Sequence, residues 1–225
     1  ELTILPANSG KRKEIALVRE KIELTANLAS AELFEVPQNQ KTEQTSKIGV
    51  INLPSFYGEG QFEEDNISTS RDVRELIDRM KEMGMEGLVL DLRNNGGGRL
   101  DEAVKLTGLF ISEGPVVQKR NFNGQVEEDW DRSNSVAWDG PLVVLTSRAS
   151  ASASEIVAGA LQSHGRAIIV GDKSTHGKGT VQAPIDLREA MRRPAEVGTV
   201  KITIQQFFLP NGDSTQNRGV LADIS

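Results

Sequence analysis

Short hydrophobic runs alternate with amphipathic segments along most of the chain. Continuous hydrophobic runs predict strands that are covered on both faces, and four such runs occur, at residues 48–53, 88–92, 142–145 and 167–170. Hydrophobic residues at helical spacing predict helices between these strands, at about 71–83, 100–110 and 152–163. This alternation of elements predicts an α/β domain.

The first predicted helix has the clearest pattern. Val73, Ile77 and Met80 recur at i, i+4 and i+7, which places them on one face. One of the hydroxyl residues at 68–70 can cap the exposed N–H groups of the first turn, and Gly84 follows where a helix commonly ends. We therefore expect a helix packed against the sheet through this face.

The two ends of the chain differ from the middle. Residues 2–5 and 14–18 alternate like short strands with turn residues between them, which predicts a small β-ribbon. A polar run at 37–46 follows, so we expect the compact domain to begin near Lys47. Residues 201–207 alternate like a strand with one open face, before a strong turn signal.

Composition narrows the class of protein. The chain has 225 residues, of which 37% are hydrophobic, and this suffices for one core. Its formal net charge of -6 argues against nucleic-acid binding, because proteins that bind nucleic acids carry a basic surface. The absence of cysteine excludes disulfides and a thiol nucleophile, and two isolated histidines argue against a structural zinc site. No hydrophobic run reaches membrane-spanning length.

A serine-rich segment at 148–155 directly precedes a predicted helix. Backbone N–H groups in the first turn of a helix lack intrahelical partners, so they can stabilise a developing oxyanion. The N–H of Ala153 is therefore a candidate donor if Ser152 is a nucleophile. A second N–H donor to the oxyanion requires a backbone segment that comes close to the serine, and the glycine-rich loop at 91–98 can supply one.

Lys178 lies between Gly177 and Gly179, in a loop that follows another predicted strand. A solvated lysine has a pKa near ~10.4 and is protonated at neutral pH, so it acts as a base only where burial lowers its pKa. Val181 and neighbouring strands can provide an apolar surround, and Gln182 can orient the amine. A serine and a lysine so placed can form a hydrolase dyad.

Other interpretations of these residues remain open. Ser152 and Glu155 fit a capping box, and the local pattern does not choose a nucleophile among Ser150, Ser152 and Ser154. A lysine in a glycine-rich loop is also typical of a solvated surface. That loop lacks the spacing of a Walker phosphate-binding motif, and the loop at 91–98 lacks that of a dinucleotide fingerprint.

Three segments, in this order, resemble the signature motifs of the tail-specific, or carboxyl-terminal processing, serine proteases. They are Asp-Leu-Arg-Asn-Asn-Gly-Gly-Gly at 91–98, Ser-Ala-Ser-Ala-Ser-Glu at 150–155 and Gly-Lys-Gly-Thr-Val-Gln at 177–182. The similarity extends from 47–50 through 108–111 to 213–216 and 219–220, and so covers nearly the whole chain. Three ordered motifs make the resemblance specific.

The resemblance implies an α/β fold with a Clp-protease or crotonase-like core of stacked strand-strand-helix units, besides the small N-terminal β-ribbon. It implies that Ser152 is the nucleophile, that Lys178 is the general base and that Gln182 holds the lysine. The oxyanion donors would be the N–H groups of Gly98 and Ala153. The neighbouring serines and the glutamate would keep a capping role.

The resemblance also implies an organisation. We expect residues 1–24 to be a remnant of a PDZ domain and its return strand, 25–46 to be a connecting segment, and 47–225 to be the catalytic core of a longer protein. Two departures from the family pattern stand out. Ser163 lies where some relatives have an aspartate, and His176 lies where an aromatic residue is common.

The expected activity is that of a serine endopeptidase that cleaves proteins near their C-termini, without a metal or an organic cofactor. Its partners would be proteins or peptides with accessible C-termini, with no nucleic acid and no stable membrane insertion, in a bacterial periplasm or cell envelope. A crotonase-like acyl-thioester enzyme would share the fold without needing both Ser152 and Lys178. A catalytically inactive peptide-binding homologue is the other alternative, and the intact motifs argue against it.

Overall fold

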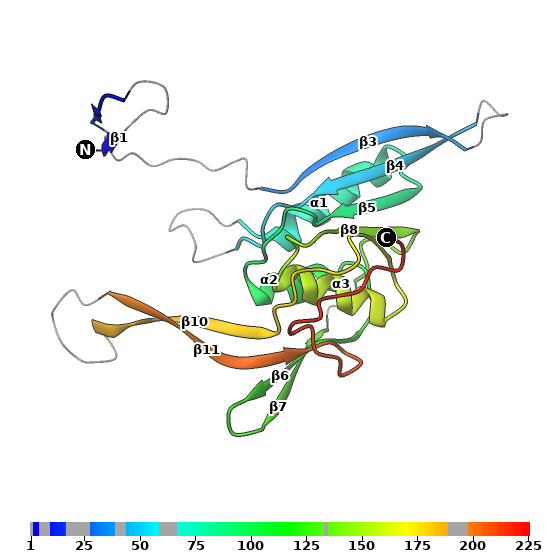
Figure 1. The fold of residues 1–225 in the computed structure, drawn as a ribbon. Coiled ribbons are helices and arrows are strands. Elements are labelled where there is room, and N and C mark those ends of the chain that lie inside the picture. Colours follow the sequence, from blue (N-terminus) through cyan, green and yellow to red (C-terminus); the bar gives the residue numbers. More distant parts are fainter. Residues whose placement is uncertain are drawn as a thin grey trace.

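A mixed five-stranded sheet lies at the centre of the fold. The computed structural model describes residues 2–4, 10–16, 28–38, 44–58, 67–132, 135–188 and 198–225. The sheet has the strand order β3-β4-β5-β8-β9 (Figure 1). Its strands are β3 (Ser30–Pro37), β4 (Thr45–Asn52), β5 (Gly87–Asp91), β8 (Leu142–Thr146) and β9 (Ile168–Gly171). β3 is antiparallel to β4, and the remaining neighbours are parallel.

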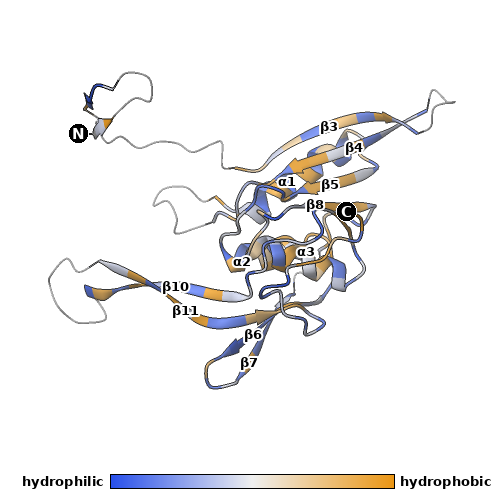
Figure 2. Cartoon of the chain, viewed as in Figure 1, coloured by the Kyte–Doolittle hydropathy of each residue, from blue (hydrophilic) through white to orange (hydrophobic). Residues whose placement is uncertain are grey.

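The four hydrophobic runs of the sequence correspond to β4, β5, β8 and β9, so these predictions are confirmed. Leu88, Leu90 and Val144 lie in the core with at most 2% of their surface exposed. Figure 2 shows the hydrophobic character of the central strands. Burial on both faces explains why these strands are continuous hydrophobic runs and do not alternate.

Among the described residues, three helices complete the central domain, and all three were predicted. They are α1 (Thr69–Glu82), α2 (Leu100–Thr107) and α3 (Ala153–Ser163). In α1, Val73, Ile77 and Met80 are buried, and the Ser68 side chain accepts a hydrogen bond from the Arg71 N–H at 3.4 Å. Among the described helices, none combines the length and the apolar character needed to cross a membrane.

A second, antiparallel sheet lies on the other side of α2 and α3 (Figure 1). In the order β10-β11-β6-β7, it contains β10 (Thr180–Asp186), β11 (Thr199–Phe208), β6 (Gly114–Asn121) and β7 (Val126–Asp131). Helix α2 contacts β6 and β7, whereas α3 contacts β6 and β9. β10 and β11 continue away from the domain as a long ribbon (Figure 1). Together the two sheets and the intervening helices confirm the predicted α/β fold.

The N-terminal part contains the predicted ribbon, in which β1 (Leu2–Ile4) pairs antiparallel with β2 (Lys13–Ile15). Residues 5 and 17–18 of the predicted strands lie outside the described residues. Residues 25–46, the expected connecting segment, contain β3, which pairs with β4 along its whole length. The central sheet therefore begins before Lys47, and the expected division into three parts remains a prediction.

Candidate active site

Ser152 occupies a sharp turn between β8 and α3. Its φ of 59° and ψ of -112° are unusual for a residue with a side chain, and such backbone conformations occur often at functional sites. The side chain lines a pocket of about 490 Å³ that also includes Lys178. The turn therefore presents the hydroxyl of a half-buried serine to a cavity.

Lys178 lies two residues before the start of β10 and reaches across to this serine. Its Nζ lies 3.5 Å from the Ser152 Oγ, at the long end of hydrogen-bond distances. Burial lowers the pKa of Lys178, and the positive charge of Lys201 lowers it further, whereas the carboxylate of Glu155 opposes both effects. The two residues that the sequence singled out thus lie together, and the lysine is shifted toward the neutral form that accepts a proton.

The carboxylate of Glu155 connects the serine turn to the lysine loop. It is fully buried and accepts backbone N–H bonds from Ser152 at 2.8 Å, Gly177 at 2.6 Å and Lys178 at 3.0 Å. The hydroxyl of Thr175 donates a fourth bond at 2.7 Å. The sequence predicted the first of these bonds as helix capping. The other three depend on a loop 20 to 23 residues further along the chain, which no local pattern could reveal.

The glycine-rich loop approaches the start of α3 very closely. A Cβ at Gly97 would lie 2.8 Å from the Ser152 Cβ and 3.1 Å from the Ala153 nitrogen, so only glycine fits there. Gly98 has a φ of 149° and forms a bridge with Phe56 through the Gly97 carbonyl and the Arg99 N–H. Neither hydrogen bond of this bridge involves the Gly98 N–H. Gly98 and Ala153 both line the pocket.

The two serines that flank Ser152 do not cap the helix, so this expectation is wrong. Both are fully buried, and their hydroxyls donate at 2.8 Å to the carbonyls of the glycine-rich loop, Ser150 to Leu92 and Ser154 to Asn95. They hold that loop against the start of α3. Of the three serines, Ser152 is the one that lines the pocket.

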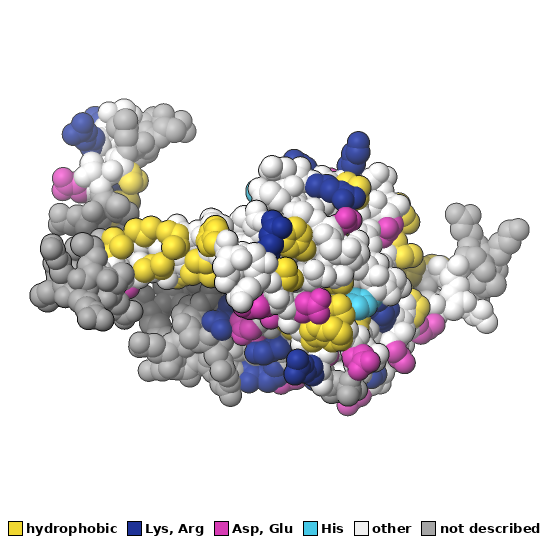
Figure 3. All heavy atoms as spheres, turned by 90° about the horizontal axis from the view of Figure 1, so that it is seen from below, with side chains coloured by type: hydrophobic (Ala, Val, Ile, Leu, Met, Phe, Trp, Pro, Cys, Tyr) yellow, Lys and Arg dark blue, Asp and Glu magenta, His cyan; other side chains and the backbone are white. Residues whose placement is uncertain are grey.

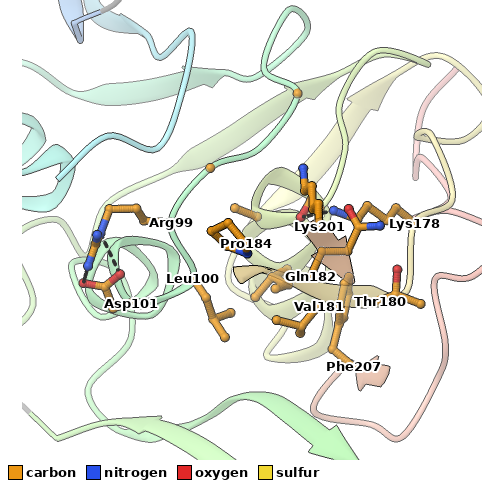
Figure 4. A pocket seen from close by; sticks show the side chains of 15 residues that line it. Arg99, Leu100, Asp101, Lys178, Thr180, Val181, Gln182, Pro184, Lys201 and Phe207 are labelled. Atoms are coloured by element: carbon orange, nitrogen blue, oxygen red, sulfur yellow. Dashed lines mark hydrogen bonds and ion pairs between the residues drawn. The ribbon is translucent and has the colours of Figure 1, made fainter. Parts of the chain in front are cut away.

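Gln182 lies in the pocket wall beside Lys178 (Figure 4). A β-bulge between Val181 and Gln182 interrupts the pairing of β10 with β11, and bulges commonly redirect a side chain. Among the described residues, no hydrogen bond joins the Gln182 amide to the Lys178 amine. The structure thus brings Gln182 to the site, without a hydrogen bond to the lysine amine among the described residues.

A C-terminal segment supports the lysine loop. The Thr215 hydroxyl donates to the Lys178 carbonyl at 2.8 Å, and the Gln216 side chain accepts from the Gly179 N–H at 2.8 Å. The resemblance included this segment but gave it no role. Ser163 lies away from the pocket lining and donates to the Gly159 carbonyl at 2.7 Å.

The pocket combines an apolar wall with a few charged groups (Figure 4). Its larger hydrophobic lining residues include Leu100, Ile156, Val181 and Phe207. Arg99 and Asp101 form an ion pair at 3.0 Å on one side. Within the described ranges, no group of three or more histidine, aspartate or glutamate residues is arranged to hold a metal ion. Such a lining suits a ligand with an apolar group.

Comparison with known proteins places this site in a family. The model of peptidase family S41 matches residues 47–225. The tail-specific protease of Haemophilus influenzae is 40% identical over 227 residues, which cover 100% of this chain and 30% of the relative. The carboxyl-terminal-processing protease of Synechocystis is 31% identical over 222 residues, covering 99% of this chain and 46% of the relative. This chain therefore spans less than half the length of either relative.

A solved structure gives the same result. The photosystem II D1 C-terminal processing protease matches with a TM-score of 0.72 and 26% identity, over 98% of this chain and 53% of that chain. The family that the three motifs predicted is thus confirmed. Because the family model matches most of the chain and both relatives exceed 30% identity along it, this chain belongs to peptidase family S41.

Proposed function

We propose that this protein is a serine endopeptidase that cleaves protein substrates near their C-termini through an acyl-enzyme on Ser152. The observation that carries the proposal is the 3.5 Å distance between the Lys178 Nζ and the Ser152 Oγ at the pocket wall. Membership of a peptidase family supports proteolysis. The names of the relatives, tail-specific and carboxyl-terminal-processing protease, support the preference for C-termini.

In the first step, neutral Lys178 accepts the hydroxyl proton of Ser152 while the Oγ bonds to the carbonyl carbon of the scissile peptide. The carbonyl π electrons move to the oxygen, which becomes an oxyanion. The N–H groups of Gly98 and Ala153 donate hydrogen bonds to it, and the positive end of the α3 dipole favours its charge. The lowered pKa of Lys178 supports its role as the base, because it enlarges the neutral fraction.

In the second step, the oxyanion collapses and the C–N bond breaks. Protonated Lys178 gives its proton to the leaving amine, and the N-terminal part of the substrate remains as an ester on Ser152. Water then attacks this ester with Lys178 again accepting a proton, so that a carboxylic acid leaves and the serine hydroxyl is restored. We assign to Gln182 the orientation of the lysine amine when substrate fills the pocket.

Turnover of an unfolded protein substrate tests this proposal. We expect Ser152→Ala and Lys178→Ala each to reduce turnover by about 1,000-fold or more. Ser163→Ala, a matched change on the same helix but outside the pocket, should retain wild-type turnover. Mass spectrometry of the wild-type products should identify new C-termini near the original one. Wild-type turnover in the Ser152 or Lys178 variant would refute the dyad.

Two further parts of the proposal concern context. We propose that residues 1–24 derive from a PDZ domain and its return strand, and that the protein acts in a bacterial periplasm or cell envelope on proteins with accessible C-termini. The bacterial sources of the relatives support the bacterial setting. Binding of acyl-CoA, with turnover that does not need Ser152, would instead favour a crotonase-like acyl-thioester enzyme.

A further inference from the structure

Lys201 is a charged residue of the pocket that the proposed mechanism does not use. It belongs to β11 and lines the same cavity as Ser152 and Lys178. Two further charged residues of the lining, Arg99 and Asp101, neutralise each other, because Arg99 donates two hydrogen bonds to Asp101, at 3.0 and 3.2 Å. Within the part of the chain that the structure describes, the Lys201 ammonium has no ion-pair or hydrogen-bond partner.

The register of the second sheet directs Lys201 toward the pocket. Lys201 pairs directly with Pro184, and Thr203 pairs with Gln182. Directly opposed residues share a face of a sheet, and both Pro184 and Gln182 line the pocket.

Alternation along β11 sends Val200 and Ile202 to the opposite face, where each is 40% exposed. Hydrophobic side chains gather along this ribbon in Figure 3. The ribbon is therefore two-sided, and its polar side carries the lysine into the cavity.

Lys201 lies near enough to Lys178 for the two charges to interact. Figure 4 shows it on the same side of the pocket as Gln182 and Lys178, across from Arg99 and Asp101. Its charge acts on Lys178 and helps to lower the pKa of that amine. A cation without a counter-ion beside a substrate cavity is an attractive site for a negative group of the substrate.

We infer that Lys201 binds a carboxylate of the substrate close to the scissile bond, and that substrates with an acidic group there are preferred. This inference rests on the proposed peptidase function. The carboxylate is either the side chain of an aspartate or glutamate or the α-carboxylate of a C-terminus within a few residues of the cleaved bond. Both present the same two oxygens to the ammonium.

Matched peptides distinguish these two sources. One series replaces Gln by Glu at each position from three residues before to three residues after the cleaved bond, and a second pair ends in a free acid or an amide. If a side chain supplies the carboxylate, we expect the Glu peptide to have a kcat/KM about fivefold higher than the Gln peptide at one position. If the C-terminus supplies it, we expect the free acid to exceed the amide by the same factor. A fivefold preference is the size expected of a solvent-accessible ion pair. The ratio within each pair cancels any change in the basicity of Lys178.

Variants of Lys201 identify the cation. Lys201→Met should reduce the acidic-to-neutral ratio to about one, and Lys201→Glu should invert it. Lys13→Met, a matched change on the N-terminal ribbon, should keep the wild-type ratio. A wild-type ratio of one for every pair, or an unchanged ratio in Lys201→Met, would overturn the inference.

Binding gives a readout that does not need turnover. The dissociation constants of the same fluorescent peptides for the Ser152→Ala variant, with and without Lys201→Met, should show the same fivefold preference and its loss. Failure of wild-type protein to cleave even the neutral peptides would refute the peptidase proposal. The difference in binding between acidic and neutral peptides would still decide whether Lys201 holds a carboxylate.

Discussion

The carboxylate of Glu155 accepts a hydrogen bond from the backbone N–H of Lys178 at 3.0 Å. The same carboxylate accepts one from the backbone N–H of Ser152 at 2.8 Å, although the lysine lies 26 positions after the serine in the sequence. One buried anion thus sets the spacing of the two candidate catalytic residues. Glu155 acts as a positioning residue, because its bonds go to three backbone N–H groups and the Thr175 hydroxyl and not to the reacting atoms.

Glu155→Gln should destabilise the fold and slow turnover. The amide NH₂ replaces one oxygen that accepts two hydrogen bonds, so buried donors lose their acceptors at a cost of about 2–4 kcal/mol in the free energy of unfolding. Chemical denaturation measures this loss. The matched control is Glu75→Gln at a side chain that is 59% exposed, and we expect it to change stability by less than about 0.5 kcal/mol. Equal stability of the two variants would contradict the bridging role.

Two substitutions should move the pH profile in opposite directions. Turnover should rise with pH as Lys178 loses its proton, and the midpoint of kcat/KM reports the pKa of the free enzyme. Lys201→Met removes a cation that lowers the pKa of Lys178, so the rising limb should move to higher pH. Glu155→Gln removes an anion that raises this pKa, so the limb should move to lower pH. Measuring kcat/KM for a neutral peptide as a function of pH gives the shift for each variant. Shifts in the same direction would contradict the assigned charges.

Gly98→Ala should unfold at a lower temperature than the wild type. Its Cβ would lie 2.3 Å from the Phe56 carbonyl oxygen, at a φ of 149° that side chains rarely adopt. We expect a loss of at least about 2 kcal/mol, or about 4–8 °C in Tm for a chain of this size. Gly96→Ala is the matched control, because a Cβ there meets no atom within 4 Å. A Tm that falls equally in both variants would show that the bridge to Phe56 is not the cause.

Gln182→Ala should reduce kcat less than Lys178→Ala does. The Gln182 side chain lines the pocket but is not bonded to the lysine amine in this structure, so we expect a loss of about tenfold, that of an orienting contact formed with substrate. Steady-state kinetics on a neutral peptide measure this effect, and Gln182→Glu should move the rising limb of the pH profile to higher pH. A kcat equal to that of the wild type would remove Gln182 from the site.

The sequence predicted those parts of the fold that local patterns encode. The central strands are continuous hydrophobic runs, and α1 has both a hydrophobic face and a cap. By contrast β7 is mostly exposed and acidic, and β10 contains Pro184, so neither resembles a strand in isolation. Each becomes a strand by pairing with its neighbour in the chain, β7 with β6 and β10 with β11, and not through a hydrophobic pattern of its own.

The candidate site divides in the same way. The motifs singled out Ser152 and Lys178, and the structure brings these two side chains together. The contribution of Glu155 to the lysine loop and the approach of Lys201 depend on tertiary contacts and strand register. The positions of Glu155 and Lys201 in the sequence do not indicate these contacts.

Labelling with a serine-directed fluorophosphonate tests most directly whether Lys178 activates Ser152. The adduct is mapped by mass spectrometry, and its rate of formation is compared between the wild type, Lys178→Ala and the control Lys13→Ala. We expect a single adduct on Ser152, formed at the same rate in the control and about 100-fold or more slowly without the lysine amine. An adduct on another serine, or equal labelling of Ser152 in the absence of Lys178, would contradict a Ser-Lys dyad.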